Sequence, residues 1–161
     1  MQKILFGSPL MQSYHTSLPI RAALAQLFQR FGFQDDAYTA KWFALYIGKT
    51  PIIYLPNIPS RVRVARFHDI HHVLTGYPAN WRGEAEIGAW ELATGCRNSF
   101  VAWFLNGGAV LVGLVLYPRD VWRAFKRGRN TRTNLYHDFE YELLLDMTVG
   151  ELRQAIGLAE A

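Results

Sequence analysis

Five side chains in the middle of the sequence have types and spacings suited to binding a metal ion. They are His68, Asp69, His71, His72 and Glu84. On a helix, residues four apart lie one turn from each other on the same face, so His68 and His72 have the spacing at which two imidazoles bind one ion. Because the chain has a single cysteine, any such site must use His, Asp and Glu ligands. The pattern predicts a metal site with nitrogen and oxygen ligands.

Helical angles alone leave two sets of ligands open. Asp69 projects about 100° from His68 and about 60° from His72, so its carboxylate can join the pair from the side. His71 forms an equally compact arc with the same two histidines. The apolar residues around His71 make a continuous helical stripe. This stripe favours a role for His71 in packing or in supporting a ligand from behind, and a role for Asp69 as a ligand or as the residue that orients one.

Glu84 is the expected partner from the next helix. If Asn80 caps that helix, the short turn TGYPAN joins two antiparallel helices and places Glu84 opposite the histidines. Glu86 points nearly the other way and is expected in solvent. Glu91 shares the face of Glu84 and could support a ligand, although a surface ion pair is its expected role. One alternative to a metal stays open, in which partly buried histidines are simply hydrogen-bonded to carboxylates.

The composition indicates one rather apolar globular domain spanning residues 1–161. Half of the 161 residues are hydrophobic, 14% are aromatic and 19% are charged. These values exclude a disordered chain, and the length excludes two sizeable catalytic domains. The lone Cys96 excludes a disulfide framework and fits a reducing compartment. The N-terminus shows no signal peptide pattern.

Hydrophobic periodicity predicts an all-α fold of about seven helices, with no strand. The metal site is expected between two antiparallel helices of this domain. The main expected helices cover 17–31, with Ser17 as its cap, 36–48, from Asp36 to Gly48, 60–75, 80–95, 100–117 and 149–158. Three prolines predict a connecting loop over 49–60. The sequence TVGE at 148–151 has the spacing of a capping box and begins the last helix.

An uncharged run over 100–117 precedes a strongly basic segment. The run is near the lower length limit for a membrane span, but Asn106, Gly107 and Gly108 interrupt it, so a buried or bilayer-contacting helix is expected. The basic residues that follow are Arg119, Arg123, Lys126, Arg127, Arg129 and Arg132. They form either a surface for anionic headgroups or an ordinary solvated face. No nucleic-acid partner is expected, because the neighbouring aromatic residues have helical core spacing.

The histidine stretch resembles the signature of a known family. The run HDIHHVLTGYPANWRGE fits H-D-x-x-H-x11-E, the motif of the ubiquinone (coenzyme Q) biosynthesis proteins of the Coq-four type. His68, Asp69, His72 and Glu84 stand on its four fixed positions. The stretches WRAFKRGR, NLYHDFEYE and LRQAIGL are also similar to the family. The resemblance covers about residues 60–158, while the family's longer N-terminal half is not recognisable and extra residues surround LLDMT.

The resemblance implies a metal-dependent carboxy-lyase that acts oxidatively on a polyprenyl hydroxybenzoate, with His68, Asp69, His72 and Glu84 as both metal-binding and catalytic residues. Zinc is the metal it implies, although iron, manganese or cobalt also suit these ligands. It further implies a hydrophobic channel for an isoprenoid lipid, peripheral association with the cytoplasmic side of a membrane, and a quinone biosynthesis complex. A homodimer is expected from the apolar helical surface. The alternative is a non-catalytic isoprenoid-binding scaffold of that complex.

Two other metal enzymes share parts of this pattern. A metalloprotease of the H-E-x-x-H kind would have Asp69 in place of its glutamate, and the shorter side chain would hold the general base further from the bound water. A phosphohydrolase with a His-Asp doublet needs a histidine upstream and an aspartate downstream. His15 and Asp138 are the best available candidates, and both are poor.

Overall fold

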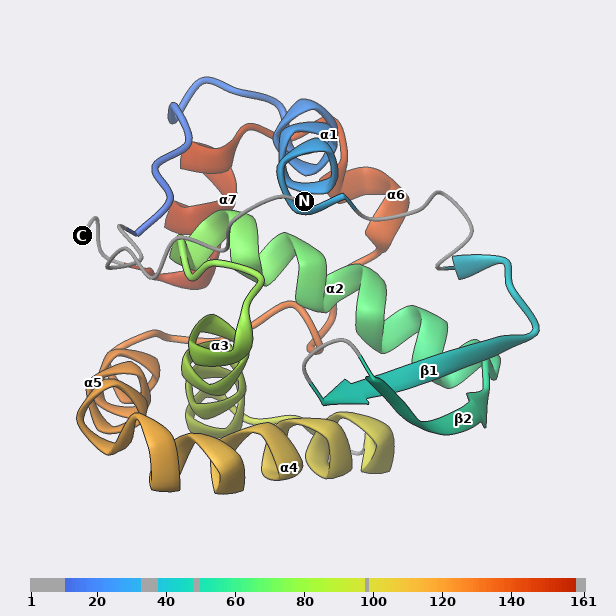
Figure 1. Ribbon diagram of the computed structural model, residues 1–161. Coiled ribbons are helices and arrows are strands. Elements are labelled where there is room, and N and C mark those ends of the chain that lie inside the picture. Colours follow the sequence, from blue (N-terminus) through green and yellow to red (C-terminus); the bar gives the residue numbers. More distant parts are fainter. Residues whose placement is uncertain (1–10, 33–37, 48–49, 98, 159–161) are drawn as a thin grey trace.

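The computed structural model describes residues 11–32, 38–47, 50–97 and 99–158, which form seven α-helices and one β-hairpin (Figure 1). The prediction of a helical domain with about seven helices is confirmed, while the hairpin is an addition to it. In chain order the elements are α1 (Ile20–Phe31), β1 (Trp42–Ile47), β2 (Thr50–Pro56), α2 (Pro59–Thr75), α3 (Trp81–Thr94), α4 (Phe100–Leu116), α5 (Pro118–Arg129), α6 (Tyr141–Leu144) and α7 (Val149–Ile156).

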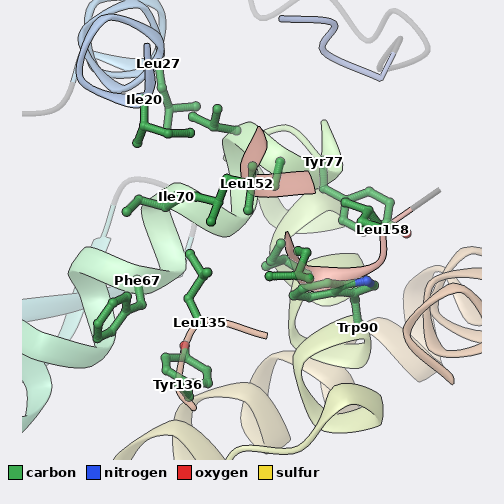
Figure 2. Close-up of a cluster of buried hydrophobic side chains, with 14 of the residues drawn as sticks. Ile20, Leu27, Phe67, Ile70, Tyr77, Trp90, Leu135, Tyr136, Leu152 and Leu158 are labelled. Carbon is green, nitrogen blue, oxygen red and sulfur yellow. The ribbon is translucent and has the colours of Figure 1, made fainter. Parts of the chain in front are cut away.

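Helix α2 lies at the centre of the domain, between two groups of helices (Figure 1). Helices α1, α6 and α7 cover one side of it, and α3, α4 and α5 lie on the other. Helix α3 packs most extensively against α4 and α5. The core joins the two groups, because Ile20 of α1, Ile70 of α2, Trp90 of α3 and Leu152 of α7 are all fully buried (Figure 2). Each such side chain contributes about 1.5–3 kcal/mol through burial, so the core fixes α2 relative to both groups.

Two glycines make possible the tight loop between α2 and α3. Gly76 ends α2 with a left-handed φ of 77°, and a Cβ there would lie 2.5 Å from the carbonyl oxygen of Gln12. A Cβ on Gly83, in the first turn of α3, would lie 1.7 Å from the carbonyl oxygen of Pro78. Asn80 caps α3 as predicted, since its side chain accepts a hydrogen bond from the Gly83 N–H. The loop is therefore compact and brings the start of α3 beside the end of α2.

The hairpin corrects two predictions from the sequence. The expected helix over 36–48 is wrong, because β1 occupies most of its described part, and the expected loop over 49–60 contains β2. The strands pair antiparallel, with Trp42 opposite Pro56. Short apolar runs do not distinguish a strand from a helix by periodicity, and each strand of a two-stranded sheet has a free edge that tolerates proline. The prolines therefore interrupt a helix here without excluding a strand.

The ends of α1 and α7 can be compared with the caps predicted from the sequence. Helix α1 begins at Ile20 after Pro19, so the prediction of a cap at Ser17 is wrong; the Ser17 hydroxyl instead lies 2.7 Å from the Nδ1 atom of His15. The predicted capping box of α7 is confirmed. The expected helix start at Asp36 and end at Gly48 lie outside the described residues.

Helix α4 presents an apolar face to the outside. Its most exposed side chains include Phe100 (79% exposed) and Val115 (81%). Its inner face holds Asn106 and Gly113, and Gly113 packs close to Ala85 of α3. None of the described helices combines the length and the apolar character needed to cross a membrane.

Candidate metal centre

The side chains of His68, His72 and Glu84 converge on one point between α2 and α3. The two histidine Nε2 atoms lie 3.1 Å apart, and Glu84 places its Oε2 atom 3.1 Å from His68 Nε2 and its Oε1 atom 3.3 Å from His72 Nε2. Zinc bound at 2.0–2.1 Å in a tetrahedral site holds its ligand atoms about 3.3–3.4 Å apart. The three side chains could therefore hold a metal ion with shifts of only a few tenths of an ångström.

Hydrogen bonds at the other ring nitrogens fix which atoms of the two imidazoles face the centre. His72 Nδ1 lies 2.9 Å from the carbonyl oxygen of Tyr77, which can only accept, so Nδ1 carries the proton and donates it. His68 Nδ1 donates in the same way to Oε1 of Glu91, at 2.9 Å. In the neutral rings, both Nε2 atoms then direct lone pairs toward the Glu84 carboxylate. Three acceptors this close repel one another unless a metal ion or added protons lie between them.

Glu91 is the main support of the centre, and its expected role in a surface ion pair is wrong. It is fully buried behind His68. Its Oε1 atom accepts hydrogen bonds from His68 and His71, at 2.9 and 2.7 Å. Its Oε2 atom accepts from Asn106 Nδ2 at 2.5 Å and from the Tyr136 hydroxyl at 2.8 Å. Burial acts to raise the pKa of Glu91, but the adjacent His68 and His71 lower it overall, so the carboxylate stays charged.

His71 has no nitrogen left for a metal. Its Nδ1 atom donates to Glu91, and its Nε2 atom accepts a hydrogen bond from the backbone N–H of Leu135 at 3.0 Å. The ring is fully buried and packs edge-on against Trp90 and Tyr136. Burial lowers the pKa of His71, although Glu91 opposes this effect. Of the two predicted roles for His71, packing in the core is confirmed, and support of a metal ligand stays a prediction.

Asp69 lies beside the three converging side chains rather than among them. Its carboxylate accepts a hydrogen bond from the Tyr38 hydroxyl. Burial raises the pKa of Asp69 overall, although the neighbouring His68 and the Tyr38 hydrogen bond act to lower it. Its role as a metal ligand therefore stays a prediction.

The centre is closed on one side and open on the other. The His72 side chain is 1% exposed, whereas those of His68 and Glu84 are 20% and 40% exposed. The position between the three side chains is therefore accessible from the side of His68 and Glu84.

Three residues considered from the sequence do not belong to the centre. Glu86 is not solvated as expected, because it is partly buried with its Oε2 atom 3.9 Å from Arg82 Nε. His15 is exposed beside Ser17, and Asp138 is exposed and paired with Arg97 at 2.6 Å. Neither joins the metal-binding group, so nothing in the described part of the chain supports the phosphohydrolase pattern.

A small apolar pocket lies between the start of α2 and the start of α4. It has a volume of about 190 Å³ and is lined by Pro56, Ile58, Arg61, Phe100, Val101, Phe104 and Leu105. Arg61 is its one charged lining residue and stands seven residues before His68, on the same face of α2. The pocket therefore adjoins the helix face that leads to the metal centre.

Comparison with models of known protein families gives no match, and comparison with curated protein sequences gives none either. The resemblance to the ubiquinone biosynthesis family therefore rests on the motif residues themselves. Membership of that family stays a prediction.

Proposed function

We propose that this protein is a divalent-metal enzyme that removes the carboxyl group from a prenylated hydroxybenzoate, the reaction implied by the family it resembles. The observation that carries the proposal is the convergence of His68, His72 and Glu84 on a position that is open on one side. A metal bound there would act as a Lewis acid toward a carboxylate or phenolate oxygen of the ring. Zinc is the metal we propose, with iron, manganese or cobalt as the alternatives.

The surrounding residues have distinct proposed tasks. Glu91 and the Tyr77 carbonyl hold the two imidazoles with their Nε2 lone pairs facing the open position. Asp69 is the proposed fourth ligand, in agreement with the motif. Arg61 has the charge to attract the carboxylate of an aromatic acid as its apolar part enters the pocket beside α4.

The proposed reaction breaks the bond between the ring carbon and its carboxylate, which leaves as CO2. In the oxidative form, one oxygen atom of O2 becomes a hydroxyl on that carbon. The other atom leaves as water, and an external two-electron donor supplies the electrons. The catalytic role assigned to His68, Asp69, His72 and Glu84 is to present the substrate's ring carbon and carboxylate in a fixed orientation for this step.

The apolar face of α4 supports a membrane-associated site for such a substrate. Its exposed residues continue from the pocket that contains Phe100 and Phe104. The exposed basic residues of α5 follow directly, which suits peripheral contact with anionic headgroups on the cytoplasmic side. A homodimer through the same face, and assembly with other enzymes of quinone biosynthesis, are further parts of the proposal.

A non-catalytic role is the second candidate. The exposed apolar residues of α4 continue beyond the pocket as far as Leu116, which favours a scaffold that binds isoprenoid lipid and partner proteins. In that case the metal would only join α2 to α3.

Release of CO2 from a prenylated 4-hydroxybenzoate in air separates the two candidates. We expect metal-loaded protein, supplied with a chemical reductant, to release CO2. Asp69→Ala and Glu84→Ala should release none, and the exposed-residue control Glu142→Ala should keep the activity. A quinone-deficient strain rescued equally by wild type and Asp69→Ala, together with no CO2 release by wild type, would refute the enzyme and support the scaffold.

A further inference from the structure

A second and larger pocket lies on the other side of α3 from the metal centre. Arg82 and Glu86 each stand two residues from Glu84, so they project from nearly the opposite face of the helix. They line a cavity of about 350 Å³ together with Arg123 and Arg127 of α5. Tyr77 and Pro78 of the loop between α2 and α3 also line it. We call this cavity the arginine pocket.

The lining of the arginine pocket is strongly cationic. Three arginines face it against a single acidic residue, Glu86. The Nε atom of Arg82 is buried, and none of the described residues accepts a hydrogen bond from it. The Oε2 atom of Glu86 lies 3.9 Å away, beyond hydrogen-bond reach. Because buried donors in proteins are nearly always satisfied, this N–H leaves the Arg82 guanidinium with unused hydrogen-bonding capacity beside the pocket.

The three guanidinium groups are held in place from behind. Asp120, which does not line the pocket, pairs with Arg82 at 3.0 Å and also with Arg123. Arg127 donates to the carbonyl oxygen of Thr75 at 2.7 Å, and its guanidinium lies over the Tyr77 ring, 5.4 Å from the centroid. Each contact uses only part of a five-donor group. The N–H groups that take no part in these contacts are therefore held in position and can donate to a ligand.

We propose that the arginine pocket binds a phosphate monoester. Guanidinium groups form paired hydrogen bonds with phosphate oxygens, and three of them can serve the three terminal oxygens of one monoester. The three arginines outnumber Glu86 and the neighbouring Asp120, so the pocket keeps a net positive charge that favours an anion. The volume leaves room for the group that carries the phosphate. That group can be a small metabolite or the headgroup of an anionic lipid, since both present the same chemistry.

Glycerol 3-phosphate tests the proposal directly, titrated calorimetrically at fixed ionic strength into metal-loaded protein. We expect saturable binding, weakened at least tenfold in Arg82→Gln and in Arg123→Gln. Arg123 is 71% exposed, so its substitution leaves the fold intact even if Arg82→Gln disturbs it. Arg129→Gln is the matched control, because it removes the same charge from an exposed position on α5 outside the pocket. Its affinity should change less than twofold.

A second arm uses vesicles that contain phosphatidic acid, which carries the same phosphate monoester. Vesicle binding that is displaced by glycerol 3-phosphate and lost in Arg123→Gln would support the pocket and identify a lipid headgroup as its ligand. Binding of glycerol 3-phosphate alone would support the pocket and identify a soluble ligand. Absence of saturable binding to either probe, or equal weakening by Arg129→Gln and Arg123→Gln, would overturn the proposal. Glycerol 3-phosphate binding lost in His68→Ala and kept in Arg123→Gln would place the anion at the metal centre and also overturn it.

Discussion

Replacing Glu91 by glutamine should weaken both the fold and metal binding. The wild-type carboxylate accepts hydrogen bonds from His68 and His71 at one oxygen and from Asn106 and Tyr136 at the other. A glutamine oxygen can serve only one of these pairs, and its amide then faces the donors of the other. Losing two charge-assisted hydrogen bonds of about 1.5–3 kcal/mol each, offset in part by removing a buried charge, predicts a net loss of about 2–4 kcal/mol.

Urea denaturation of the metal-stripped protein measures this loss, and competition with a chromophoric chelator measures metal affinity. Affinity should fall about 10- to 100-fold, because the His68 imidazole loses the partner that fixes its orientation. Glu142→Gln is the matched control, since Glu142 is exposed and lies 4.0 Å from Arg66 in a surface pair of little energetic value. The reasoning is refuted if Glu91→Gln matches this control in both measurements.

Three further perturbations follow from the same contacts. The unfolding free energy of metal-stripped protein should fall below about pH 6.5, because burial lowers the pKa of His71 and the unfolded state then binds a proton that the folded state resists. It should also fall above about pH 6.5, because Glu91 and Glu84 raise the pKa of His68 overall against the effect of burial, so that a proton bound in the folded state is lost. A stability curve that rises or falls steadily from pH 5 to 9 in urea denaturation would contradict this. Gly76→Ala should cost about 2–4 kcal/mol through its positive φ and the clash of its Cβ, whereas Gly107→Ala, which meets open space in α4, should stabilise by about 0.5–1 kcal/mol in the same denaturation assay. Val115→Glu should weaken liposome flotation about tenfold with little effect on stability, and unchanged flotation would remove α4 from the membrane contact.

The local parts of the centre were predictable from the sequence. His68 and His72 share a helix face, and Gly76 and Asn80 mark the ends of the two helices that meet. These features depend on residues within a few positions of one another, where helical geometry decides the outcome. The placement of His71 followed for the same reason, because an apolar stripe shows which face of a helix is buried.

The supports of the centre depend on contacts between distant segments. Glu91 meets Asn106 of α4 and Tyr136, which follows α5, so its burial could not be read from α3 alone. One signal was present, since Asn106 interrupts an otherwise apolar run and therefore needed a buried polar partner. The hairpin was missed because Trp42–Ile47 is too short for its apolar pattern to separate strand from helix.

Metal content measured by elemental analysis of purified protein tests the central claim most directly. Wild type and His15→Ala, which changes an exposed histidine outside the centre, should carry a stoichiometric amount of one transition metal. His72→Ala and Glu84→Ala should carry only traces while remaining folded by circular dichroism. Equal metal content in all four proteins, or its absence from wild type purified in the presence of zinc, iron, manganese and cobalt, would contradict a metal centre at these residues.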